Sequence, residues 1–139
     1  MEYEGEYLIG KKYNGKGYDT NGNIIYELKN GTGKVKEYDY GRLEFEGEYL
    51  NGKRNGKGKE YDNYSKLKFE GEYLNGKRNG KGKEYDYNGK LVFEGEYLDG
   101  KKWNGKLFDE KSNIICELIN GNGKMNEYND NGTLIFEGE

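Results

Sequence analysis

Phe45-Glu46-Gly47-Glu48-Tyr49-Leu50-Asn51-Gly52-Lys53-Arg54-Asn55-Gly56-Lys57-Gly58-Lys59-Glu60-Tyr61-Asp62 decides the fold, because the same eighteen residues return unchanged at 69–86. The two copies start 69 − 45 = 24 residues apart, and a third unit opens at Phe93 after the same interval. A fixed period of this length is the signature of a repeat array. The sequence therefore predicts one structural unit, repeated along the chain.

Weaker copies extend the array in both directions. We place the units near residues 3, 26, 45, 69, 93, 116 and 136, which makes six full units and a stub in a single array spanning residues 1–139. The units at 26 and 116 are short, so a long-plus-short pair brackets the two uniform central units. Terminal units of repeat arrays are often atypical because they cap the stack.

Each unit shows the alternation of a β-strand rather than the spacing of a helix. Leu43, Phe45 and Tyr49 share one parity, which puts them on one face of a strand, while Glu46 and Glu48 fall on the other. The same parity holds in the next two units. The predicted aromatic core is Phe45, Tyr49, Phe69, Tyr73, Phe93 and Tyr97.

Asn-Gly pairs supply the turns. Asn51-Gly52 and Asn55-Gly56 lie between the two halves of the unit, and Asn-Gly is the strongest short hairpin signal. We expect the strand to resume at residues 57–61, so that each unit is one antiparallel hairpin. The hairpins should continue one all-β, elongated, single-layer twisted antiparallel sheet of about thirteen strands, about 60 Å long at about 4.8 Å per strand.

Glycine also recurs inside the expected strands. Gly56 and Gly58 form a Gly-x-Gly pair that repeats in other units, and Gly47 recurs at a second position. Glycine within a strand usually marks a bend or the close approach of another group. We expect these glycines to leave room for aromatic rings of the same or neighbouring hairpins.

Composition limits the function. Hydrophobic residues make up 32% and charged residues 35%, and the net charge is −3. That near-balance offers no field to attract nucleic acid. The chain has no histidine, one cysteine (Cys116) and no run of about 20 apolar residues for crossing a membrane. We expect a cytoplasmic protein that is not an enzyme, with no cofactor, no catalytic residues and no metal site.

The central units resemble the MORN (membrane occupation and recognition nexus) repeat. The resemblance rests on the order aromatic, Glu-Gly-Glu-Tyr, Asn-Gly-Lys, Gly-x-Gly, and it covers nearly the whole chain. Two positions differ: Asn55 and its equivalents stand where the family often has histidine, and the first-strand aromatic is always Tyr. The resemblance implies an elongated sheet of hairpins and a scaffold role near the cytoskeleton or membranes.

The sequence is compatible with three functions. The first is a non-enzymatic scaffold that binds protein partners through the sheet surface. The alternative is peripheral binding of anionic phospholipid headgroups, and carbohydrate or choline binding between aromatic rings is a third. The candidate contacts for headgroups or a partner are Lys53, Arg54, Lys57, Lys77, Arg78 and Lys81.

Three local features have simpler explanations. The paired carboxylates Glu46/Glu48 recur in most units, whereas an active site occurs once, so a structural role fits them better. Cys116 stands where other units open with Phe or Tyr, which predicts a small buried apolar residue. The stub Phe136-Glu137-Gly138-Glu139 is half a hairpin and is an edge strand able to pair with a second copy, giving a homodimer through terminal hairpins.

Overall fold

The computed structural model describes residues 2–8, 11–19, 21–128 and 134–138, with side chains at 3–7, 14–19 and 21–123. Thirteen strands form, and every described pairing is antiparallel. They are β1 (Glu2–Leu8), β2 (Lys11–Tyr18), β3 (Ile24–Leu28), β4 (Gly33–Asp39), β5 (Arg42–Leu50), β6 (Lys53–Tyr61), β7 (Leu67–Leu74), β8 (Lys77–Tyr85), β9 (Leu91–Leu98), β10 (Lys101–Phe108), β11 (Ile114–Ile119), β12 (Asn122–Tyr128) and β13 (Leu134–Gly138).

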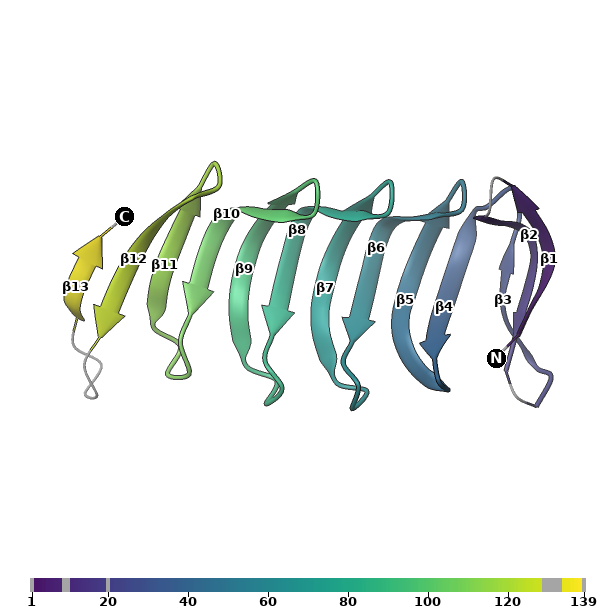
Figure 1. Cartoon of the computed structure of the whole chain (residues 1–139), viewed down its shortest axis with the longest axis horizontal. Coiled ribbons are helices and arrows are strands. Elements are labelled where there is room, and N and C mark those ends of the chain that lie inside the picture. The colour runs from purple at the N-terminus through teal and green to yellow at the C-terminus, as the bar shows by residue number, and fades with distance from the viewer. Residues whose placement is uncertain (1, 9–10, 20, 129–133, 139) are drawn as a thin grey trace.

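The strands follow one another along an elongated single layer (Figure 1). The all-β hairpin array is therefore confirmed. The expectation of one continuous sheet is wrong, because β1–β3 form a three-stranded sheet and β4–β13 a ten-stranded one.

The break lies between β3 and β4. These strands form no ladder with each other, and only an isolated bridge joins Lys29 to Thr32 in the turn between them. A continued ladder would bring Tyr26 opposite Val35, and both side chains are buried, at 8% and 4% exposure. In the equivalent hairpin of the central unit, Gly47 lies opposite Gly58. The equivalent residues of the other short unit, Cys116 and Met125, are register partners in a continuous ladder, so bulk at this position does not by itself separate the strands.

The hairpin turns use two residues of positive φ. Asn51 and Gly52 have φ of 52° and 79°, and Asn75-Gly76 and Asp99-Gly100 behave alike. The expected second turn at Asn55-Gly56 is wrong: β6 already begins at Lys53. Gly56, with φ of 89°, instead lies in an irregularity where the pairing of β5 with β6 shifts register. A bulge of this kind strengthens the local twist.

Aromatic rings lie over the strand glycines, as expected. A Cβ added to Gly58 would approach the Phe45 ring to 2.6 Å and the Tyr73 ring to 2.9 Å. Gly82 stands in the same relation to Phe69 and Tyr97. The rings belong to neighbouring hairpins, so each glycine holds successive units in contact. No helix in the described residues is long and apolar enough to cross a membrane.

Candidate binding surface

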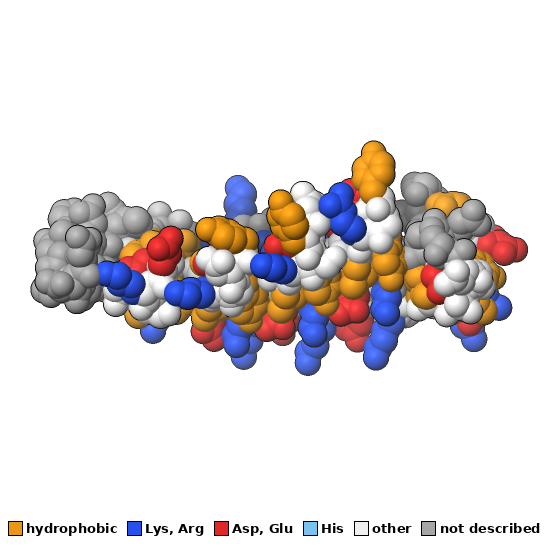
Figure 2. Space-filling view, turned by 90° about the horizontal axis from the view of Figure 1, so that it is seen from below, with side chains coloured by type: hydrophobic (Ala, Val, Ile, Leu, Met, Phe, Trp, Pro, Cys, Tyr) orange, Lys and Arg blue, Asp and Glu red, His pale blue; other side chains and the backbone are white. Residues whose placement is uncertain are grey.

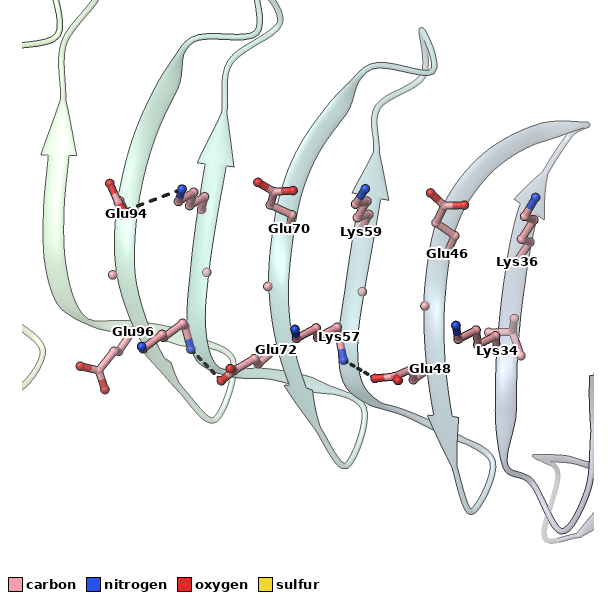
Figure 3. A pocket seen from close by; sticks show the side chains of 18 of the residues that line it. Lys34, Lys36, Glu46, Glu48, Lys57, Lys59, Glu70, Glu72, Glu94 and Glu96 are labelled. Atoms are coloured by element: carbon pink, nitrogen blue, oxygen red, sulfur yellow. Dashed lines mark hydrogen bonds and ion pairs between the residues drawn. The ribbon is translucent and has the colours of Figure 1, made fainter.

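The face opposite the aromatic rings carries a long groove across six strands. Glycines form its floor, together with Val35 on β4, and the space between its walls is about 920 Å³. Figure 3 shows the walls as two rows of charged side chains, one on each side of the glycines. They are Lys34, Lys36, Glu46, Glu48, Lys57, Lys59, Glu70, Glu72, Lys81, Lys83, Glu94 and Glu96.

Charge in the groove alternates strand by strand. The walls of β4, β6 and β8 are lysine on both sides of the floor, and those of β5, β7 and β9 are glutamate on both sides. Lys59, for example, pairs in register with Glu46 on one side and Glu70 on the other. The face is therefore electrically neutral as a whole and striped in detail.

Several of the glutamates are tied to the sheet. Glu48 accepts a hydrogen bond from the Lys57 backbone N–H at 2.8 Å, and Glu72 accepts one from Lys81 at 3.0 Å. The Tyr61 hydroxyl donates to Glu46 at 2.5 Å, and Tyr85 donates to Glu70 at 2.8 Å. Partial burial and then the facing carboxylate raise the pKa of Tyr61 and of Tyr85 to about 12.

All six lysines of the groove are exposed. Among the described side chains, the only ion pair between groove residues is that of Lys83 with Glu94, at 3.9 Å. The wall charges are therefore not neutralised by ion pairs with one another, and the ammonium groups remain accessible to a partner. A ligand laid along the groove would meet positive and negative stripes in alternation, one at each strand step of about 4.8 Å.

The aromatic face, by contrast, is closed. Phe45, Phe69 and Phe93 are fully buried, and Tyr73 and Tyr97 nearly so. Phe69 meets Tyr73 and Tyr97 edge-on, with ring centroids 5.8 and 5.3 Å apart. The predicted aromatic core thus packs as a continuous row, and only Tyr49 is half-buried. In the described residues these rings pack against one another, whereas carbohydrate or choline binding would need exposed rings.

Two of the predicted contact residues belong to this closed face. The Arg54 guanidinium lies 4.0 Å from the centre of the Phe45 ring, and that of Arg78 lies 3.9 Å from the Phe69 ring. Arg54 also binds Glu37 at 2.6 Å, and Arg78 binds Glu84 at 2.9 Å. Stacking and pairing of this kind occupy the guanidinium group.

Glu60 shows how the charges on the aromatic face are balanced. It accepts hydrogen bonds from the Tyr73 hydroxyl at 2.5 Å and from Arg78 at 2.8 Å. Burial by itself would raise the pKa of Glu60, but the bonds from Arg78 and Tyr73 outweigh it, so the pKa is lowered. Burial, followed by the bond to a glutamate, raises the pKa of Tyr73 and Tyr97. Glu60 therefore stays ionised as part of the fold.

The six predicted cations do not form one cluster. Lys57 and Lys81 line the groove, whereas Arg54 and Arg78 stack on the aromatic face. Lys53 and Lys77 begin β6 and β8 beside the hairpin turns, and Lys77 pairs with Asp99 at 3.5 Å. The lysines and glutamates that flank the groove glycines were not recognised from the sequence as one surface. Their i, i+2 spacing around glycine was the available signal.

The asparagine at the family's frequent histidine position has a structural role that the sequence did not reveal. The Asn79 Oδ1 accepts a hydrogen bond from the backbone N–H of Asp99, at 3.0 Å, in the next hairpin turn. Asn14, Asn55 and Asn104 do the same for the turns at Asn30, Asn75 and Asn120. A backbone bond runs alongside, from the Gly100 N–H to the Arg78 carbonyl at 2.8 Å. Each turn is thus fastened to the preceding hairpin.

The edge of the sheet opposite the Asn-Gly turns, called the loop edge below, carries exposed tyrosines. Tyr40, Tyr64 and Tyr87 stand in three consecutive loops and are 92%, 82% and 72% exposed. Figure 2, seen from that edge, shows hydrophobic side chains projecting between basic ones. The basic groups hold loops together: Lys66 Nζ donates to the Tyr87 carbonyl at 3.1 Å, and Lys90 Nζ to that of Glu110 at 2.8 Å.

The remaining predicted residues are placed as follows. Cys116 is buried at 5% exposure, as expected. Residues 136–138 lie in β13, the last strand of the large sheet, paired on one side with β12. Glu139 lies outside the described residues. No three His, Cys, Asp or Glu side chains in the described part are grouped so as to hold a metal ion.

Comparison with known families identifies the repeat. The family model of the MORN repeat matches residues 45–66 and 69–90. The centre of the chain consists of MORN repeats. Each matched MORN repeat supplies one glutamate strand and one lysine strand to the groove, and together they form its middle. No curated protein matches the chain.

Proposed function

We propose that the MORN array is a non-enzymatic interaction module that binds a protein partner along the charged groove. The observation that carries the proposal is the groove itself: an open channel of about 920 Å³ with a glycine floor and exposed lysines. A face of this kind has polar groups to specify a partner and a narrow, largely backbone floor for it to lie on.

The division of labour between the two faces supports this assignment. The aromatic face uses its rings, arginines and glutamates to hold the hairpins together, so its polar groups are already paired. The groove lysines are exposed, so they can contact a partner without disturbing the aromatic core. A rigid sheet that presents a free row of side chains is suited to recognition.

Binding of anionic phospholipid is less well supported by the same geometry. Basic clusters attract an anionic leaflet by about 1 kcal/mol for each Lys or Arg near the surface. In the groove, six lysines are matched by six glutamates, and Arg54 and Arg78 are engaged elsewhere. The striped face therefore has no net positive charge to attract a membrane.

A capture experiment tests the proposal. The whole chain and the variant Lys57→Glu/Lys81→Glu, each immobilised, are exposed to extract of the source cells and to vesicles containing phosphatidylserine. We expect a protein retained by the parent chain and lost from the variant, with vesicles bound by neither. The matched control Lys66→Glu/Lys90→Glu changes the same charge at the loop edge and should retain the protein. Retention independent of the groove, or retention of vesicles alone, would contradict the proposal.

A further inference from the structure

The groove charges are antisymmetric about the groove centre. From β4 to β9 the signs run plus, minus, plus, minus, plus, minus. The midpoint lies between β6 and β7, and any two strands at equal distance on either side of it carry opposite charges. Lys36 on β4 and Glu94 on β9 are the outermost members of one wall, and Lys34 and Glu96 are those of the other.

This antisymmetry makes the face complementary to itself under one symmetry operation. Two copies of a sheet can meet face to face about a twofold axis that lies in the interface, as in other closed dimers. An axis along the strands, through the midpoint, sets β6 against β7 of the second copy and β4 against β9. Every lysine strand then faces a glutamate strand. An axis along the groove would set each strand against itself, lysine against lysine.

The size of the face is near that of a stable dimer interface. Six strands about 4.8 Å apart, each about eight residues long at about 3.3 Å per residue, offer on the order of 700 Å² per copy. A standard interface buries about 800 Å² on each partner. The strand-parallel axis also keeps the two sheets in the aligned orientation that stacked sheets adopt.

We propose that the protein partner of the groove is a second copy of this chain, packed face to face about that axis. The inference rests on the proposed function and names its partner. Lys59 faces Glu70 of the second copy, Lys83 faces Glu46, and Lys36 faces Glu94 along one wall. Along the other, Lys57 faces Glu72, Lys81 faces Glu48, and Lys34 faces Glu96. The arrangement leaves the aromatic face and the loop tyrosines outside the interface.

The first test uses the unaltered chain. Multi-angle light scattering should show a mass that rises with concentration toward twice the 16.1 kDa of one chain, and falls back in 1 M salt. A carbodiimide, which joins a lysine directly to a carboxylate, should link Lys36 to Glu94. Within one chain these residues lie five strands apart, about 24 Å, so that link reports contact between copies. A single-chain mass at every concentration overturns the inference, as does a dimer linked only through its terminal strands.

The second test exchanges charges. The twofold axis produces the contact between Lys59 and Glu70 of the other copy twice. Lys59→Glu or Glu70→Lys therefore turns two attractive contacts into like-charge contacts, and each should weaken association by about tenfold or more. Mixing the two variants restores both contacts, so the mixture should dimerise as the parent does. The controls Lys66→Glu and Glu110→Lys make the same changes in loops and should leave association unchanged. Failure of the mixture to recover, with both variants folded by thermal melting, contradicts the face-to-face arrangement.

The two proposals fail in different ways. If the chain is monomeric but a protein from the extract is lost from Lys57→Glu/Lys81→Glu, the binding face stands and the second-copy inference falls. If neither association nor capture depends on the groove, both fall.

Discussion

At the scale of single residues, four equivalent asparagines fasten each hairpin to the next: Asn14, Asn55, Asn79 and Asn104. The side chain accepts a hydrogen bond from a backbone N–H of the following turn, which is formed by two residues of positive φ. A turn left with an unpaired N–H would lose part of its hold on the array.

Removal of this fastening should destabilise the chain. Asn79→Ala deletes the acceptor for the Asp99 N–H, and we expect unfolding free energy to fall by about 1 kcal/mol. Urea melts followed by tyrosine fluorescence would measure the change. Asn63→Ala is the matched control, since the bond at that residue uses its backbone carbonyl. An equal effect of the two substitutions would rule out the fastening.

Two loops carry serine where a related loop carries glycine. Ser65 has φ of 62° in the loop between β6 and β7, and Gly89 has φ of 82° at the same place in the next loop. A side chain in this left-handed region costs about 1–2 kcal/mol, of which the flexibility of glycine cancels part. We expect Ser65→Gly to raise stability by about 0.5 kcal/mol and Gly89→Ala to lower it by about 1 kcal/mol. Denaturant melts of the two variants should move in opposite directions.

Single residues differ in how well their surroundings could be predicted from the sequence. The parity of Phe45 and Tyr49 gave the core face, because side chains alternate along any strand. The arginine at position 54 was harder to place. A flexible cation next to a turn is expected in solvent, yet Arg54 stacks on Phe45 and pairs with Glu37, a contact 17 residues away. Such contacts depend on which residues of two hairpins lie opposite each other. That pairing cannot be predicted reliably from a single sequence.

At the scale of elements, the unit is a hairpin whose two faces are separated by glycine. Gly58 and Gly71 face each other across β6 and β7 and let aromatic rings pack over the backbone. Tyr26 and Val35 stand at the equivalent place of β3 and β4, where the ladder is interrupted. The sequence showed the shortened unit but not the break, since pairing across a turn depends on how side chains fit together.

Carboxylates paired with tyrosines should make the hairpins sensitive to pH at both extremes. Glu60 has a lowered pKa, so its contribution is present above the unfolded value of about 4.3 and is lost as pH falls below it. Tyr61 and Tyr85 have raised pKa values, so their contribution is present below about 10 and is lost as pH rises toward about 12.

Melting temperatures measured from pH 2 to 12 would check this expectation. We predict a plateau between about pH 5 and pH 10, with a fall on each side. Tyr61→Phe/Tyr85→Phe should reduce the alkaline fall and leave the acid fall in place. An alkaline limb that is the same in this variant would exclude the two tyrosines as its cause.

At the scale of the whole molecule, repetition turns a weak local feature into a long surface. One hairpin has a glycine flanked by two lysines on one strand and two glutamates on the other. Six strands in order give a continuous striped groove, with the aromatic row closed behind it. The repeat period, the hairpins and the core residues were predictable from sequence. The groove was not, because its walls exist only after successive strands of neighbouring hairpins stand side by side.

Binding through the charged groove is tested most directly by a lysine-acetylation footprint of the chain, compared between the free chain and the chain bound to its partner. On binding, we expect acetylation to fall at four groove lysines: Lys57, Lys59, Lys81 and Lys83. Lys53, Lys66 and Lys90 should react as before. Protection at the hairpin ends or the loop edge, with the groove lysines still reactive, would contradict the central claim that the MORN array binds through its charged groove.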